Sequence, residues 1–161
     1  MSKTVICPGS FDPVTCGHLD IIKRASGMFD KVVVAVLVTS SKTPTFTTEE
    51  RIDLLQQATA GLRNVEIVSF EGLLAGYCKN SGIDTIVKGL RAVSDFEYEF
   101  QMAIANKKLN PELETIFLTA DADSTFLSSS MVREIGSMGG DIRNFVPACV
   151  HERIAAKLRN R

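Results

Sequence analysis

The feature that most constrains the fold is a regular alternation of short apolar runs with longer amphipathic segments. Residues 31–38 contain an unbroken and mostly β-branched run, which is typical of a strand buried on both faces. Shorter runs of the same character predict four more strands, at residues 4–7, 65–68, 85–87 and 115–118. This alternation predicts an α/β fold with a doubly wound, parallel, five-stranded sheet and helices on both faces.

Helices are predicted between these strands by apolar residues at helical spacing and by residues that mark helix ends. The pairs Thr47–Glu50 and Ser94–Glu97 have the spacing of a capping box and predict that helices begin there. Gly61 and Gly82 are expected to end two helices. Pro147 suits the first turn of the last helix. Because no linker or repeat interrupts the pattern, we expect a single domain spanning residues 1–161.

Composition restricts the classes of partner. The net charge is -1, from 18 basic and 19 acidic residues, so no global field favours nucleic acid or a membrane as partner. The four cysteines form no C-x-x-C pair and only two histidines occur, so no structural zinc site is expected. No apolar run approaches membrane-spanning length, and no signal peptide precedes the first strand. We therefore expect a cytoplasmic protein with reduced thiols.

Parallel sheets of this kind bind ligands beyond the carboxyl ends of their strands, so the residues that follow each strand are the first candidates for a site. Residues 8–18 follow the first strand and open the first helix, where free N–H groups favour phosphate. Gly9 permits a tight turn and Gly17 a close approach to a ligand. His18 can donate a hydrogen bond to a phosphate oxygen, or it can be a core histidine on the apolar stripe of the helix. The loop matches neither a Walker A sequence nor a G-x-G-x-x-G fingerprint.

Three further groups follow strands. Lys88-Gly89-Leu90-Arg91 comes directly after residues 85–87, and its two cations suit a triphosphate or a second phosphorylated substrate, although a solvated pair is an equal alternative. Residues 124–130 contain three serines at a helix start; one caps the helix, the others are free to meet phosphate, and Arg133 can add charge. Lys42 also follows a strand. Asp121 and Asp123 are interpreted as a polar loop.

Taken together, these residues resemble the nucleotidyltransferase superfamily that carries the T/H-x-G-H motif, here Thr15-Cys16-Gly17-His18. Ser128-Ser129-Ser130 with Arg133 resembles its second motif. The combination with Pro8-Gly9-Ser10-Phe11-Asp12-Pro13, Lys88-Gly89-Leu90-Arg91 and Asp95-Phe96-Glu97-Tyr98-Glu99 resembles, more narrowly, bacterial phosphopantetheine adenylyltransferases, whose fold is Rossmann-like. The four motifs occur in order, from about residue 4 to the last helix.

The resemblance implies a reaction in which ATP and 4′-phosphopantetheine give dephospho-coenzyme A and pyrophosphate with Mg²⁺. It implies in-line attack on the α-phosphorus without a covalent enzyme intermediate, so the protein positions substrates and stabilises charge. It also implies a homohexamer and feedback inhibition by coenzyme A.

The resemblance further implies roles for individual residues. His18 would be catalytic and would stabilise charge on the ATP phosphates. Phosphopantetheine would be bound by Ser10, Lys42, Leu74 and Lys88. ATP would be bound by Ser10, Phe11, His18, Gly89, Leu90, Arg91, Glu99, Ser124, Thr125, Phe126, Leu127, Ser128, Ser129 and Ser130.

Two departures from the family pattern and two alternatives remain. Lys88 stands where many relatives have arginine; lysine keeps the charge but lacks the bidentate fork of a guanidinium. Ser10 stands where many have threonine. The chain could instead be another superfamily member, such as a nicotinamide mononucleotide adenylyltransferase or a cytidylyltransferase. It could also be a nucleotide-binding sensor without catalysis, although the presence of His18, Lys42 and Arg91 argues against that.

Overall fold

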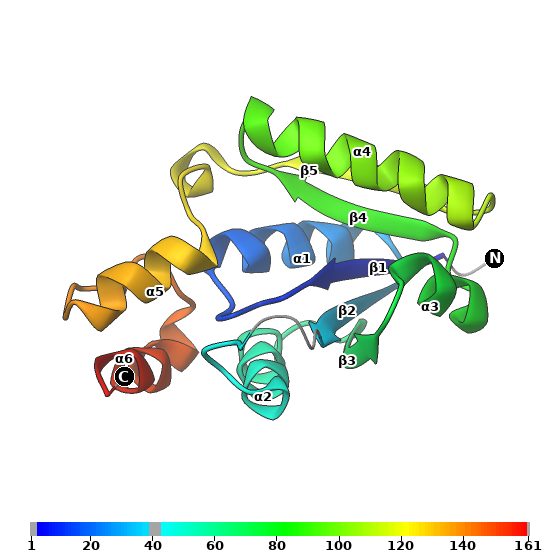
Figure 1. Ribbon diagram of the computed structural model, residues 1–161. Helices are drawn as coiled ribbons and strands as arrows, with labels where there is room; N and C mark the ends of the chain where they lie inside the picture. Colours follow the sequence, from blue (N-terminus) through cyan, green and yellow to red (C-terminus); the bar gives the residue numbers. More distant parts are fainter. Residues whose placement is uncertain (1–2, 39–42, 161) are drawn as a thin grey trace.

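One parallel sheet organises the chain in the computed structural model, which describes residues 3–38 and 43–160. Its five strands lie in the order β3-β2-β1-β4-β5 (Figure 1). The strands are β1 (Thr4–Gly9), β2 (Lys31–Val38), β3 (Val65–Glu71), β4 (Thr85–Leu90) and β5 (Glu114–Thr119). The predicted doubly wound α/β fold is confirmed, and each strand contains the apolar run that predicted it.

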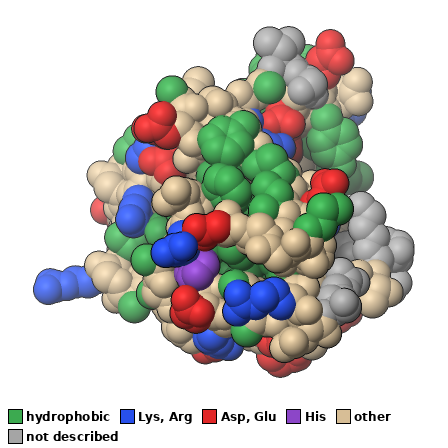
Figure 2. All heavy atoms as spheres, turned by 90° about the vertical axis from the view of Figure 1, so that its left-hand side faces the viewer, with side chains coloured by type: hydrophobic (Ala, Val, Ile, Leu, Met, Phe, Trp, Pro, Cys, Tyr) green, Lys and Arg blue, Asp and Glu red, His purple; other side chains and the backbone are tan. Residues whose placement is uncertain are grey.

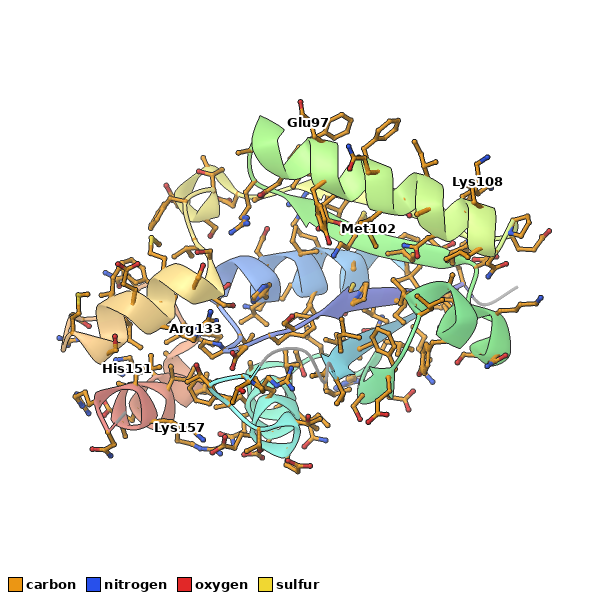
Figure 3. The ribbon with its side chains drawn as sticks, in the orientation of Figure 1. Glu97, Met102, Lys108, Arg133, His151 and Lys157 are labelled. Atoms are coloured by element: carbon orange, nitrogen blue, oxygen red, sulfur yellow. The ribbon has the colours of Figure 1, made fainter. Side chains whose placement is uncertain are left out.

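Helices connect the strands and cover both faces of the sheet. They are α1 (Cys16–Met28), α2 (Thr48–Ala58), α3 (Leu74–Ser81), α4 (Val93–Leu109), α5 (Ser129–Ser137) and α6 (His151–Arg159), with short 3₁₀ turns η1 (Ala122–Ser124) and η2 (Ala148–Val150). Lys157 reaches from α6 towards α2, where it pairs with Glu50 (Figure 3). No helix among the described residues is long and apolar enough to cross a membrane.

Alternation along the strands builds two cores. In β2, Val32, Val34 and Val36 pack with α1, α2 and α6 on one face, whereas Val33 and Ala35 pack with α3 on the other. All five side chains are at most 5% exposed. A strand buried on both faces can therefore be continuously apolar, as the sequence of β2 is.

The helix ends decide which start and stop signals were correctly interpreted. Thr47 and Glu50 form the predicted capping box of α2, and Gly82 ends α3 at φ 65° as expected. The prediction for Gly61 was wrong, because α2 ends at Ala58. There Thr59 follows as the cap residue, and its hydroxyl donates to the Leu55 carbonyl.

Two other helix starts also differ from prediction. Helix α4 begins at Val93 with Ala92 at the cap position, so Ser94 lies inside the helix rather than at its cap, and Glu97 points outward (Figure 3). The backbone N–H groups of Asp95 and Phe96 bond the Ala92 carbonyl instead. Pro147 precedes η2 rather than lying in the first turn of α6.

Candidate active site

A cleft of about 680 Å³ opens at the carboxyl ends of β1 and β4. The chain runs outward from β1 to β2 and from β4 to β5, so the strand order reverses between β1 and β4. Ligands of open parallel sheets bind at such a switch point. A smaller hollow of about 260 Å³ lies near Thr4 and Lys31, at the amino ends of the strands and away from every predicted site residue.

The cleft brings together three segments that are far apart in sequence. The predicted site residues that line it are Ser10, Phe11, His18, Lys88, Gly89, Arg91, Glu99, Ser124, Leu127, Ser128, Ser129 and Ser130. The lining also contains Asp95 and Tyr98, which were not predicted as site residues, and Arg133, for which only added charge was suggested.

Among the described residues, four that were predicted for the site do not line the cleft. Leu74 opens α3 and packs on the core that also contains Val33 and Ala35. The Thr125 hydroxyl donates to the Ala122 carbonyl, and Phe126 is 57% exposed. Leu90 ends β4 outside the lining. Lys42 lies outside the described residues.

His18 is held by the first turn of its own helix. Thr15 is the cap residue of α1, and its hydroxyl accepts a hydrogen bond from the His18 backbone N–H. In return, the backbone N–H of Thr15 donates to His18 Nδ1 at 3.1 Å. Because Nδ1 accepts, the proton of the neutral ring lies on Nε2. None of the described residues hydrogen-bonds Nε2, so this N–H is available to a ligand in the cleft.

The charge state of His18 follows from its surroundings. Burial lowers its pKa, and the nearby charges of Arg91 and Lys88 lower it further, from 6.5 to about 4. The imidazole is therefore neutral near pH 7. The ring can therefore donate a hydrogen bond from Nε2 to an anion while remaining uncharged itself.

Phe11 supports the ring of His18 from the neighbouring loop. The two ring centroids are 5.0 Å apart and the planes meet at 70°, an edge-on contact. Phe11 has φ 49°, in the left-handed region that a bulky residue adopts at a cost of about 1 kcal/mol. Gly9 makes room for this arrangement, because a Cβ there would lie 3.1 Å from the Phe11 ring.

Two cations at the end of β4 are each held by a carboxylate of α4. Lys88 Nζ lies 3.3 Å from Glu99 Oε1, and the Arg91 guanidinium binds Asp95 through two nitrogens, at 2.9 and 3.2 Å. Arg91 also donates to the Leu127 carbonyl, which ties β4 to the serine segment. All four side chains remain partly exposed, so an incoming phosphate can compete with these carboxylates.

The glycine between these cations lines the cleft and is also constrained by packing. A Cβ on Gly89 would lie 2.9 Å from Ile21 Cγ1. Gly89 therefore allows α1 to pack closely on β4.

The serine segment divides its hydroxyls among several tasks. Ser128 caps α5 by accepting from the Met131 N–H, which confirms that one serine serves as cap. The expectation that the other hydroxyls are free was wrong for Ser129, which donates to the Pro13 carbonyl at 2.7 Å. Ser130 Oγ lies 3.0 Å from Ser128 Oγ. Ser129 thus joins α5 to the loop that carries His18.

Arg133 makes a second link between α5 and that loop. Its guanidinium donates to the Asp12 carbonyl and lies 3.6 Å from the Asp12 carboxylate (Figure 3). The same carboxylate accepts from the backbone N–H groups of Thr45 and Phe46. Asp12 therefore fixes the relative positions of the segments that follow β1 and β2.

Known proteins place this cleft in a family. A sequence model described as cytidylyltransferase-like matches residues 6–135. A protein from Caldanaerobacter subterraneus subsp. tengcongensis, named phosphopantetheine adenylyltransferase, is 54% identical over 157 residues, which are 98% of each chain. The chain belongs to the phosphopantetheine adenylyltransferase family, within the cytidylyltransferase-like proteins.

The fold agrees with this family assignment. A crystal structure from Vibrio parahaemolyticus, provisionally named a nicotinate-nucleotide adenylyltransferase, has a TM-score of 0.70 and 20% identity. The match covers 99% of this chain and 93% of that one. At this identity the likeness shows the shared fold alone.

Proposed function

We propose that the cleft transfers an adenylyl group from ATP to 4′-phosphopantetheine, giving dephospho-coenzyme A and pyrophosphate. The observation that carries this proposal is a neutral His18, with its proton on Nε2, lining a cleft that also contains Lys88, Arg91 and Arg133. Such a cleft suits a polyanionic substrate in a protein whose net charge is only -1.

The transfer proceeds by direct in-line attack, in which a phosphate oxygen of phosphopantetheine bonds the α-phosphorus as pyrophosphate leaves. The cleft offers no activated nucleophile among its described residues. Burial raises the pKa of the Cys7 thiol to about 12, even though the charge of Lys88 opposes the shift, so no thiolate forms near pH 7. The acceptor phosphate is already anionic and needs no general base. The protein therefore contributes alignment and charge stabilisation.

His18 donates from Nε2 to a phosphate oxygen of ATP, and this bond strengthens as charge shifts onto the leaving pyrophosphate. Ser10 lies at the junction of the two substrates. Phe11, Gly89, Arg91, Glu99, Ser124 and residues 127–130 contribute to the ATP site, with Leu90, Thr125 and Phe126 at its margin. Lys88, Lys42 and Leu74 contact phosphopantetheine.

Mg²⁺ would be the metal ion of this reaction, bound together with the nucleotide. Among residues 3–38 and 43–160, no group of three or more histidine, cysteine, aspartate or glutamate side chains could hold a metal ion. Asp95 and Glu99 are the carboxylates in the cleft lining, and both are ion-paired. This donor set fits an ion held mainly by phosphate oxygens and water, with these two carboxylates nearby. Bound in that way, Mg²⁺ would neutralise phosphate charge.

The protein works in the cytoplasm as a homohexamer that coenzyme A inhibits. Helix α4 supports self-association, because Phe96, Tyr98, Phe100, Met102 and Ile104 are between 41% and 63% exposed along it. Hydrophobic side chains also gather on the side of the molecule where α5 and α6 lie in Figure 1 (Figure 2). Sedimentation of the purified protein would test the hexamer.

A pyrophosphate-release assay tests the proposed reaction. Release should require ATP, 4′-phosphopantetheine and Mg²⁺ together. It should fall to background when CTP replaces ATP or nicotinamide mononucleotide replaces the acceptor. Release with either replacement would favour another superfamily activity. Calorimetric ATP binding without any release would favour a sensor.

A further inference from the structure

Arg51, which lies outside the cleft, holds the loop that contains the cleft residues Ser10 and Phe11. Arg51 lies in α2 and is 3% exposed, and it does not line the cleft. Its Nη1 donates to the Ser10 carbonyl at 2.8 Å and to the Leu37 carbonyl at 3.2 Å. Its Nη2 donates to the Thr48 hydroxyl at 3.1 Å, and its Nε lies 3.4 Å from the Thr47 carbonyl.

The two carbonyls that Arg51 Nη1 binds lie just beyond the pairing between β1 and β2. The β1–β2 ladder ends at the pair Gly9–Val36, so Ser10 and Leu37 are the first residues after it. Arg51 bridges them at the point where the strands separate. A single buried guanidinium therefore continues the connection between β1 and β2 up to the edge of the cleft.

The carbonyl of Ser10 belongs to the peptide that leads into Phe11. Arg51 therefore holds one side of a peptide whose other side is the left-handed Phe11, a conformation that persists only where the surroundings enforce it. The Phe11 ring in turn contacts His18 edge-on. A chain of contacts runs from Arg51 through this peptide to the ring of His18.

Burying the charged guanidinium of Arg51 costs free energy, and no ion pair among the described residues offsets that cost. No carboxylate lies within 4.0 Å of the Arg51 guanidinium among the described ion pairs, and burial lowers its pKa, although Asp12 and Glu49 counteract the shift through their charges. Its partners are neutral oxygens of the backbone and one hydroxyl. A group placed this way stabilises one backbone arrangement rather than an ion pair.

We propose that Arg51 is a positioning residue for adenylyl transfer, which holds the Ser10–Phe11 peptide so that Ser10 and His18 keep the geometry that the transfer needs. This inference rests on the proposed function. Because Arg51 acts through the loop, its replacement should lower the rate of the chemical step more than it lowers the affinity for substrate.

The test compares Arg51→Met, which keeps length without donors, Arg51→Lys, which keeps the charge without the fork, and Asn64→Ala. Asn64 is the matched control, because its amide binds the Ser26 and Phe29 carbonyls at the opposite end of the sheet. At a temperature where each variant is folded, Arg51→Met should lower kcat about 10- to 100-fold with the ATP Kd within threefold. Arg51→Lys should lie between it and the wild type, and Asn64→Ala should keep kcat within twofold.

A second readout needs no substrate. Titration of His18 by NMR should show its pKa rising from about 4 towards 6.5 in Arg51→Lys and Arg51→Met, because the loop loosens and admits water. An unchanged His18 titration together with a kcat loss no larger than that of Asn64→Ala would overturn the proposal. A wild type without adenylyl transfer would contradict the proposed function alone, since the titration would still report on Arg51.

Discussion

The two sides of the cleft hold their functional groups by different means. In the β1–α1 loop, residues 10–15, the groups are fixed through the backbone: Arg51 binds the Ser10 carbonyl and the Thr15 N–H binds His18 Nδ1. In the β4–α4 segment, residues 88–99, Lys88 and Arg91 are paired with Glu99 and Asp95. On the first side, the His18 donor is held in place before a substrate binds, and we call it preset. On the second side, each cation is paired with a carboxylate that a phosphate can displace.

This difference assigns separate tasks to the two sides. A preset donor can favour the transition state without reorganisation, so changes in the β1–α1 loop should affect turnover. A cation that exchanges one anionic partner for another contributes to substrate affinity, so changes in the β4–α4 segment should affect binding. The predictions below test this division, from the largest expected effect to the smallest.

Replacing His18 with alanine should lower kcat at least 100-fold while the ATP Kd changes less than about threefold, because the donor acts mainly in the transition state. Single-turnover kinetics and calorimetry would measure the two quantities. His18→Asn is the matched control for the helix cap, since its amide oxygen can still accept from Thr15, and it should lose turnover as well. A proportionate loss of ATP binding, with normal turnover of bound substrate, would contradict the catalytic role.

Replacing Arg91 with alanine should weaken ATP binding about 10- to 100-fold, which corresponds to the loss of a charge-assisted bidentate contact. Turnover at saturating ATP should fall much less. Arg91→Lys keeps the charge without the fork and should give an intermediate affinity. If calorimetry finds normal ATP affinity in Arg91→Ala, the assignment of this residue to the nucleotide is wrong.

Replacing Lys88 with alanine should raise the KM for phosphopantetheine about tenfold and leave the ATP Kd nearly unchanged. Lys88→Arg should keep the acceptor KM within threefold, because it retains the charge at this position. An unchanged acceptor KM in Lys88→Ala would remove phosphopantetheine from this side of the cleft.

Acid should destabilise the wild type through His18 more than it destabilises His18→Asn. The pKa of His18 is lowered from 6.5 to about 4 in the folded protein, so only the unfolded chain takes up a proton between these values. The contribution of neutral His18 to the free energy of unfolding is intact above pH 6.5. It is lost as pH falls to about 4, and the loss is at most about 3 kcal/mol. Urea unfolding of both proteins at pH 7 and pH 4.5 measures the difference, and parallel losses would refute the assigned pKa.

Much of the fold could be predicted because it depends on local pattern. The strand at 31–38 and the Thr47–Glu50 box were visible in the sequence, since burial on both faces and a capping pair leave direct signatures. The Ser94–Glu97 pair has the same spacing, but Ala92 rather than Ser94 takes the cap position of α4. Tertiary contacts around Arg91 and Asp95 accompany the earlier start of α4, and no local pattern contains them.

The location of the site could be predicted from the sequence, but the contacts that hold its residues in place could not. The position of His18 after the first strand indicated a phosphate site, but its capping role did not, because histidine is not the usual third residue of a capping box. Nothing in the sequence indicated that Arg51 is buried, because an arginine beside Glu49 and Glu50 in a helix is typical of a solvated face. Its burial depends on where two strand ends meet, which only the assembled fold determines.

The state of the His18 ring tests the central claim most directly. The protein has only two histidines, so ¹⁵N-labelling gives few ring signals, and His18→Asn identifies those of His18. At pH 7 the free protein should show a neutral ring with its proton on Nε2, and protonation should begin only near pH 4. A proton on Nδ1, or a ring that titrates near 6.5, would contradict the preset, uncharged donor on which the account depends.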